Sequence, residues 1–160
     1  MNDTMNFMQS LLSNSIQDTE VYAKQFVKAV IDSYTEGGSA LVVGLSGELG
    51  SGKTTFMKGV AKAFGVTETV TSPTFVIEKI YKLKDKPFKK LIHIDAYRLE
   101  KGKELLTLGW GEIQKNPENI IFIEWPERVK EVLPKDMIPI TFTVIGEHER
   151  EIKVNVNIKN

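Results

Sequence analysis

The stretch ALVVGLSGELGSGKTT, residues 40–55, decides the fold of this 160-residue chain. Its first part, ALVVGLS (40–46), is a continuous apolar run of strand length, which is typical of a strand buried on both faces of a sheet. Its second part, GELGSGKTT (47–55), matches the phosphate-loop pattern G-x-x-x-x-G-K-[ST]. A buried strand, a glycine-rich turn and the start of a helix predict a loop that holds a nucleoside triphosphate.

Each residue type in this loop has a physical task. Glycines allow a tight turn that points successive backbone N–H groups at phosphate oxygens. Lys53 brings a flexible cation to the β- and γ-phosphates, and the Thr54 hydroxyl is a ligand for Mg²⁺. Thr55 can hydrogen-bond a more distal phosphate. The predicted nucleotide-binding residues are Gly47, Glu48, Leu49, Gly50, Ser51, Gly52, Lys53, Thr54 and Thr55.

Strands and helices alternate on both sides of this stretch. Ser15 is placed to cap a helix over 16–35, with Asp18 as its capping-box partner. Elsewhere, continuous or alternating apolar runs predict strands, and periodic runs predict helices. The strands are expected at 75–83 and 91–95, which could pair as a hairpin, at 119–125, and in a terminal hairpin of 140–146 and 150–158. The helices are expected at 53–64, at 101–115 with breaks at Gly109 and Gly111, and at 126–133.

This order predicts an α/β fold of the P-loop NTPase type, a three-layer sandwich with a mainly parallel central sheet and antiparallel additions. We expect a single domain over residues 1–160, in which residues 1–14 form a loosely ordered extension. The chain has no cysteine, which excludes disulfides and thiolate chemistry, and no apolar run near the roughly 20 residues of a membrane-spanning helix. Its 21 basic and 21 acidic residues balance, which argues against a stand-alone nucleic-acid binder. A cytoplasmic protein without a secretory signal is expected.

Two acidic residues end apolar strands: Asp95 closes LIHID and Glu124 closes IIFIE. Open α/β sheets bind their ligands at the carboxyl ends of strands. Either acid could hold Mg²⁺ or orient an attacking water, and either could simply mark the end of a strand. His93 shares a strand face with Asp95, and a structural role is its simpler interpretation. For Trp125, core packing and contact with a nucleotide or partner both remain open.

The segment TSPTF (71–75) lies between the phosphate-loop helix and the next strand. A loop at this place senses the γ-phosphate in phosphate-loop switches, and Ser72 and Thr74 offer hydroxyls around the stiff Pro73. An ordinary loop leading into a strand explains the same composition. The nearby lysines at 82, 84, 86, 89 and 90 fit either a solvated hairpin or contact with a phosphate backbone.

Four blocks in this order, GELGSGKTT, TSPTF, HIDAYRL (93–99) and IEWPERV (123–129), resemble the bacterial TsaE family, also called YjeE. These are small ATPases required for the threonylcarbamoyladenosine modification of tRNA. The resemblance runs from about Thr19 to about Ile152. The sequence departs from the family pattern in a longer lysine-rich hairpin at 84–90 and in the segment before Ser15.

The resemblance implies an ATPase that uses ATP and Mg²⁺, with the metal held by Thr54 and the Walker-B-like Glu124. Lys53, Asp95 and Glu124 would be its catalytic residues, and Ser72, Pro73 and Thr74 its switch-like loop. Thr19 matches a position near the nucleotide base. The family signature residues are His93, Tyr97, Arg98 and Trp125. The implied partners are TsaD and TsaB, with tRNA contacted indirectly.

Two other functions fit the same phosphate loop. A small-molecule kinase commonly gathers several arginines around its phosphates. This chain has three, Arg98, Arg128 and Arg150, in different elements, which counts against a nucleotide kinase. A non-catalytic nucleotide switch would need no hydrolysis, and the presence of both Asp95 and Glu124 argues for chemistry instead.

Overall fold

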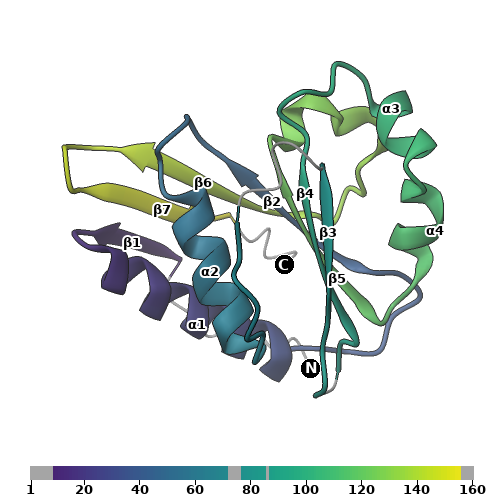
Figure 1. Cartoon of the computed structure of the whole chain (residues 1–160), viewed down its shortest axis with the longest axis horizontal. Helices are drawn as coiled ribbons and strands as arrows, with labels where there is room; N and C mark the ends of the chain where they lie inside the picture. Colours follow the sequence, from purple (N-terminus) through teal and green to yellow (C-terminus); the bar gives the residue numbers. More distant parts are fainter. Residues whose placement is uncertain (1–8, 72–76, 86, 156–160) are drawn as a thin grey trace, which may run out of the picture.

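A computed structural model describes residues 9–71, 77–85 and 87–155 of the chain. Its strands are β1 (Ser10–Ser13), β2 (Leu41–Ser46), β3 (Glu78–Lys82), β4 (Lys90–Asp95), β5 (Asn119–Glu124), β6 (Ile138–Val144) and β7 (Arg150–Val154). Across the described residues, these seven strands form one mixed sheet in the order β1-β7-β6-β2-β5-β4-β3. Strands β6, β2, β5 and β4 pair in parallel, and β1, β7 and β3 are antiparallel additions at the two sides. The predicted α/β fold with a parallel centre is confirmed (Figure 1).

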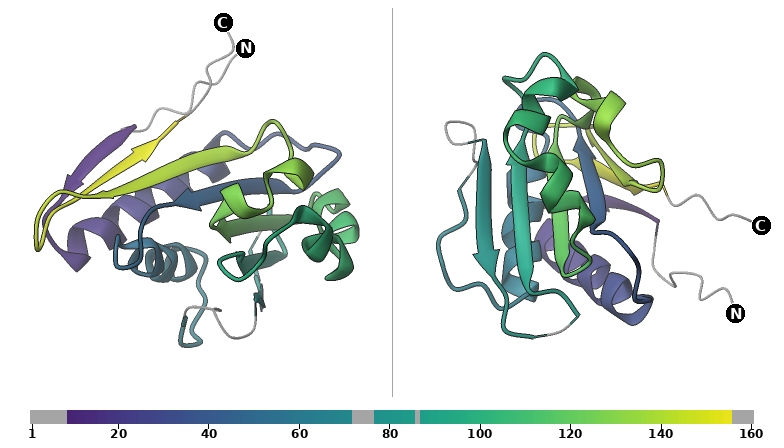
Figure 2. Two further views of the ribbon diagram at one scale, coloured as in Figure 1. Left: turned by 90° about the horizontal axis from the view of Figure 1, so that it is seen from above. Right: turned by 90° about the vertical axis from the view of Figure 1, so that its right-hand side faces the viewer.

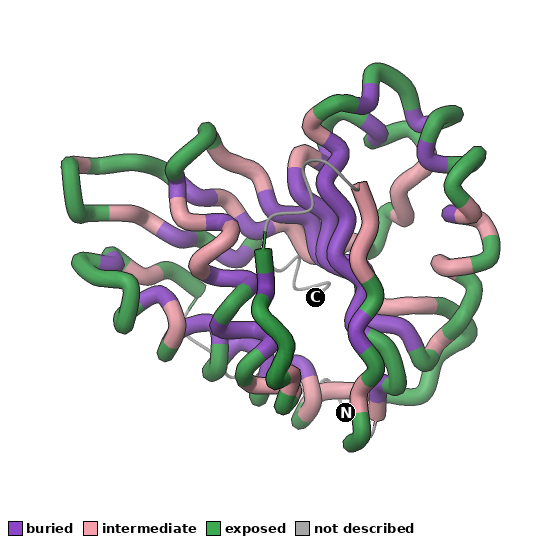
Figure 3. Tube along the Cα trace, viewed as in Figure 1, coloured by how far each residue is buried: buried purple, intermediate pink, exposed green. Residues whose placement is uncertain are grey.

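Helices cover both faces of this sheet and make three layers. They are α1 (Ile16–Asp32), α2 (Lys53–Ala63), α3 (Gly102–Thr107) and α4 (Trp110–Lys115). Helices α1 and α2 pack on each other over one face, whereas α3 and α4 lie over the other (Figures 1 and 2). The central strands are buried along most of their length, as their continuous apolar runs predict (Figure 3).

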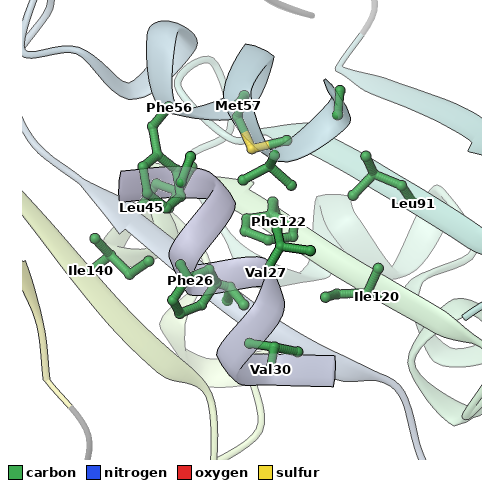
Figure 4. Packing of buried hydrophobic residues seen from close by; sticks show 14 of the residues in the cluster. Phe26, Val27, Val30, Leu45, Phe56, Met57, Leu91, Ile120, Phe122 and Ile140 are labelled. Atoms are coloured by element: carbon green, nitrogen blue, oxygen red, sulfur yellow. The ribbon is translucent and has the colours of Figure 1, made fainter. Parts of the chain in front are cut away.

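Strand β5 supplies side chains to both faces, because successive residues of a strand point to opposite sides. Ile120 and Phe122 join the core beneath α1 and α2, where Phe26 and Phe56 also lie (Figure 4). Ile121 and Ile123 join the core on the opposite face, with Trp110 among others: Val42, Ile92, Ile94, Leu105 and Val129.

Helix α1 begins as its capping signal predicts. The Ser15 Oγ accepts a hydrogen bond from the Asp18 N–H at 3.0 Å. The Asn14 N–H donates a hydrogen bond to the Asp18 carboxylate at 3.0 Å, one residue earlier than the donor of a regular capping box. The helix ends at Asp32, before the predicted 35, where the Ser33 hydroxyl bonds back to the Ala29 carbonyl at 2.7 Å.

The structure corrects three expectations. Residues 126–133 form two short 3-10 turns, η1 (Pro126–Arg128) and η2 (Lys130–Val132), where the sequence predicts a helix. Val129 separates these turns, because its backbone, at φ −133° and ψ 22°, is not helical. The helix expected over 101–115 is broken at Gly109, at φ +88°, as predicted, but the second expected break is absent because Gly111 lies within α4.

The third correction concerns the N-terminal segment. The sequence predicts a loosely ordered extension before Ser15, but Ser10–Ser13 form strand β1 and pair antiparallel with β7. The register joins Leu11 to Ile152, and Leu11 packs against the core beneath α1 and α2. Within the described part of the chain, no helix is long and apolar enough to cross a membrane.

Candidate functional site

The glycine-rich loop connects the end of β2 to the start of α2 and is shaped by its own glycines. Gly50 and Gly52 have φ values of +77° and +103°, a conformation that side-chain-bearing residues rarely adopt. At Gly47 the constraint is packing, because a Cβ there would lie 2.6 Å from the Ser51 Oγ and 2.7 Å from the Phe142 carbonyl oxygen. The tight turn expected from the motif is therefore required by both backbone and packing.

Lys53 opens helix α2, and its side chain is folded over the loop. Its Nζ donates hydrogen bonds to the carbonyl oxygens of Gly47 and, at 3.1 Å, of Glu48. The same nitrogen lies 4.5 Å from the centroid of the Trp125 ring. Burial lowers the pKa of the Lys53 ammonium, and the nearby negative charges, with Glu124 the strongest, oppose that shift. The lysine is thus a partly desolvated cation held by weak acceptors that phosphate oxygens could replace.

The two strand-end acids lie side by side. Asp95 on β4 and Glu124 on β5 are partners in the parallel register, and 6% and 3% of their surfaces are exposed. The Asp95 Oδ1 accepts a hydrogen bond from the Tyr97 N–H at 2.9 Å. The Glu124 Oε2 lies 2.9 Å from the Nε2 of fully buried His93. The parallel pairing brings together residues that are 29 positions apart in the sequence, at the edge where the loop also lies.

A cavity of about 390 Å³ unites these groups. Its wall includes Lys53, Thr54, Thr55, Asp95, Glu124 and Trp125. A second cavity of about 190 Å³ lies on the other side of the loop, where Gly52 and Thr55 meet Thr19 and Arg150. Thr19, matched by resemblance to a base-proximal position, therefore lines a cavity that borders the phosphate loop.

The remaining predicted site residues are spread around the first cavity. Tyr97 lies in its wall and contacts the Trp125 ring, with centroids 5.1 Å apart. Trp125 has a left-handed backbone with φ of +58°, which is rare for an aromatic residue. Arg98 is exposed, and Leu49 at the loop tip is 71% exposed. Ser72, Pro73 and Thr74 lie outside the described residues.

Sequence reasoning missed several contacts at the loop. Arg150, at the start of β7, donates from Nε to the Gly50 carbonyl at 3.2 Å and from Nη1 to the Gly146 carbonyl at 2.8 Å. The Ser13 hydroxyl forms a buried 2.7 Å hydrogen bond with the Thr19 hydroxyl. The Arg128 guanidinium lies 5.7 Å from the Tyr97 ring centroid. The predicted terminal hairpin places Arg150 at the start of a strand. The contact of Arg150 with the glycine loop, however, depends on how the chain folds, and the sequence pattern does not show it.

The donor set fits a phosphate-bound magnesium ion. In the described part of the chain, no group of three or more His, Asp or Glu side chains is placed to hold a metal without help. Mg²⁺ commonly takes only one or two protein ligands, with phosphates and water completing its shell. The Thr54 hydroxyl and the Glu124 carboxylate in one cavity match that requirement. The Ser51 Oγ is buried in the loop without a hydrogen-bond partner among the described residues. It could therefore form a hydrogen bond with a bound ligand.

A mixed α/β sheet with parallel central strands, a glycine-rich loop between β2 and α2, and acids at the ends of β4 and β5 define a protein of the P-loop class. The sequence matches the family described as threonylcarbamoyl adenosine biosynthesis protein TsaE over residues 13–152. The chain therefore belongs to the TsaE family.

Individual relatives agree with this assignment. The tRNA threonylcarbamoyladenosine biosynthesis protein TsaE of Treponema pallidum is 35% identical over 143 residues, covering 89% of this chain and 97% of that protein. The Bacillus subtilis protein of the same name is 40% identical over 111 residues, covering 69% of this chain and 66% of that protein. The crystal structure of Bacillus subtilis YdiB matches with a TM-score of 0.68 at 30% identity, covering 91% of this chain and 82% of the other.

Proposed function

We propose that this protein is a Mg²⁺-dependent ATPase that serves threonylcarbamoyladenosine modification of the tRNA adenosine next to the anticodon. Its cytoplasmic partners would be TsaD and TsaB, and tRNA would be reached through them. The observation that carries the ATPase proposal is the convergence of Lys53, Thr54, Asp95 and Glu124 on one cavity beside the glycine loop. Family membership supports the pathway, and the resemblance of the four sequence blocks supports the partners.

Nucleotide binding would replace contacts that the loop now makes with itself. Lys53 donates to the Gly47 and Glu48 carbonyls, which are neutral acceptors. Phosphate oxygens are charged acceptors and form stronger hydrogen bonds with an ammonium group. Burial lowers the pKa of Lys53, and the phosphates would oppose this lowering, because added negative charge favours the ammonium form.

The acids divide the remaining work. Thr54 and Glu124 would hold Mg²⁺, which when bound neutralises charge that develops on the phosphates. Asp95 is assigned to orienting the attacking water, because its carboxylate faces the same cavity and is itself oriented by the Tyr97 N–H. Both carboxylates already line the cavity.

The two alternatives have less support. A kinase needs cations around the acceptor, yet Arg150 bonds to backbone carbonyls and Arg128 stacks against Tyr97. A non-catalytic switch could use Glu124 to hold Mg²⁺, but it gives no reason for a second buried acid, Asp95, in the same cavity. The fate of the γ-phosphate distinguishes the three functions: an ATPase releases it as free phosphate, a kinase transfers it to an acceptor, and a non-catalytic switch leaves it on ATP.

The deciding experiment measures phosphate release from ATP by the purified protein, with TsaD and TsaB added or omitted. We expect slow release alone, faster release with both partners, and loss of both activities in Lys53→Ala. Lys58→Ala is the matched control, because Lys58 lies on the same helix but is exposed. No release in any mixture would contradict the ATPase proposal, and transfer of labelled γ-phosphate to a small acceptor would favour a kinase. Failure of the protein to co-purify with TsaD and TsaB would contradict the proposed partnership.

A further inference from the structure

The buried contact between His93 and Glu124 has no role yet in the proposed chemistry. His93 is on β4 and points to the same sheet face as Asp95, two residues later. Its register partner on β5 is Phe122, so Glu124 is its diagonal neighbour on that face. The side chain of His93 is fully buried, and only 4% of the Glu124 side chain is exposed.

The protonation of this pair follows from the role of Glu124. A carboxylate that holds a cation is ionised, and an ionised carboxylate only accepts hydrogen bonds. With Glu124 in the metal-holding role, we therefore assign the His93 Nε2 as the donor across the 2.9 Å contact and the Glu124 Oε2 as the acceptor. This bond engages one carboxylate oxygen and leaves Oε1 for other partners.

The nearby Lys53 explains why such a donor is needed. Glu124 is the strongest of the charges that raise the pKa of Lys53, so the two groups attract each other across the cavity. Even so, among described residues no carboxylate oxygen lies within 4.0 Å of the Lys53 Nζ. The fully buried imidazole supplies Glu124 with a hydrogen-bond partner that does not come from the lysine.

We propose that His93 is a positioning residue, whose Nε2–H holds the Glu124 carboxylate in the orientation that receives Mg²⁺. This inference rests on the proposed function, because it assigns His93 to the metal side of the same site. Groups that hydrogen-bond a metal-binding side chain commonly change metal affinity by ~10–100-fold when removed. Removal of the imidazole is therefore expected to weaken the Mg²⁺-dependent part of ATP binding and to spare the Mg²⁺-independent part.

The test is isothermal titration calorimetry with ATP in excess Mg²⁺ and in EDTA. The quantity compared is the dissociation constant in EDTA divided by the dissociation constant in Mg²⁺. We expect His93→Leu, which fills the space without a donor, to reduce this ratio by about tenfold or more. His93→Gln can place an amide N–H near the position of Nε2, and we expect it to restore the ratio to within about threefold of the wild-type value.

Leu91→Ala is the matched control for general loosening of β4. Leu91 is fully buried on the same strand and the same face, but belongs to the hydrophobic core. This variant should lose stability and keep the wild-type ratio. If His93→Leu does not fold by circular dichroism, His93→Asn replaces it, since its shorter amide cannot reach Glu124 and should show the same loss.

The outcomes separate the two proposals. A wild-type protein that binds ATP equally well with and without Mg²⁺ would overturn both the magnesium-dependent function and the role of His93. If ATP binding by the wild-type protein depends strongly on Mg²⁺ and His93→Leu or His93→Asn shows the same ratio, the positioning role alone is overturned. A ratio reduced equally by Leu91→Ala would also overturn it, because the effect would then belong to strand packing.

Discussion

Asp95 and Lys53 face the same cavity, but the backbone holds them in different ways. Lys53 is held by acceptors that a nucleotide would displace, whereas Asp95 accepts a hydrogen bond from the Tyr97 N–H within its own loop. Asp95 is therefore oriented before any nucleotide binds. ATP binding must therefore rearrange the side chain of Lys53 but not that of Asp95.

This difference predicts the behaviour of Asp95→Asn. An asparagine keeps an oxygen that can accept from the Tyr97 N–H, so we expect ATP affinity to stay within about threefold of wild type. Hydrolysis should fall by about 100-fold or more, because the charge that orients the water is lost. Phosphate release and ATP titration measure the two effects, with exposed Asp136→Asn as the control. Equal loss of binding and hydrolysis would contradict a purely catalytic role.

Gly47 gives a second prediction for a single residue. A methyl group there would meet the Ser51 hydroxyl and the backbone of Phe142, and the backbone contact cannot yield cheaply. We expect Gly47→Ala to reduce the free energy of unfolding by about 1–3 kcal/mol and to weaken ATP binding. At Gly38 a Cβ meets nothing within 4 Å, so Gly38→Ala should change stability by less than about 0.5 kcal/mol. Urea denaturation compares the two, and equal midpoints would show that the loop relaxes around the methyl group.

At the scale of elements, short segments depend on side-chain caps. Helix α3 begins at Gly102, whose N–H donates a hydrogen bond to the Glu131 carboxylate in the turn η2. The Glu104 carboxylate accepts from the N–H groups of Glu100 and Lys101 at the same end. A helix of six residues has little stability of its own, so these carboxylates help to hold it in place.

These caps predict a dependence of stability on pH. The hydrogen bond from Gly102 N–H lowers the pKa of Glu131, and bonds from Glu100 and Lys101 lower that of Glu104. A folded-state pKa below the unfolded value of about 4.3 means that the stabilisation is present above that pH. It is lost as the pH falls through the lowered pKa. Glu131→Gln keeps an acceptor but cannot titrate, so its urea midpoint should fall less than that of wild type between pH 5 and pH 3. Parallel curves for the two proteins would contradict this role of Glu131.

The elements also show how far sequence reasoning reaches. Strands β2, β4 and β5 are predicted to within one residue because burial on both faces produces continuous apolar runs. Strand β1 has only four residues, and its alignment depends on β7, so its sequence SLLS carries no adequate signal of its own. In the same way, the strand parity of His93 indicates its face, but its contact with Glu124 depends on the register between β4 and β5.

At the scale of the whole molecule, β5 joins the two hydrophobic cores. All six of its residues are buried, and alternate side chains enter the core on each face of the sheet. A substitution that loosens β5 on one face of the sheet therefore also weakens the packing on the other face. We infer that the two cores unfold together.

Phe122→Leu tests this coupling. Phe122 packs against Phe26 beneath α1, with ring centroids 6.2 Å apart, and its truncation should cost about 1–2 kcal/mol. Trp110 is fully buried in the core on the opposite face and reports on that side. In a Trp125→Phe background, we expect the Trp110 fluorescence and the far-UV circular dichroism of Phe122→Leu to shift to the same lower urea midpoint. Separate midpoints would show that the cores unfold independently.

The pairing of β1 with β7 has a consequence for the synthesis of the protein. Among the described residues, β1 pairs with β7, and 136 residues, 14–149, lie between these two strands in the sequence. At ribosomal rates of about 5–20 residues per second, the interval is on the order of ten seconds. Throughout that time the Ser13–Thr19 contact can form, whereas Leu11 has no β7 partner. The cavity beside Thr19 and Arg150 is therefore completed only after β7 has been made, long after the first residues of its wall.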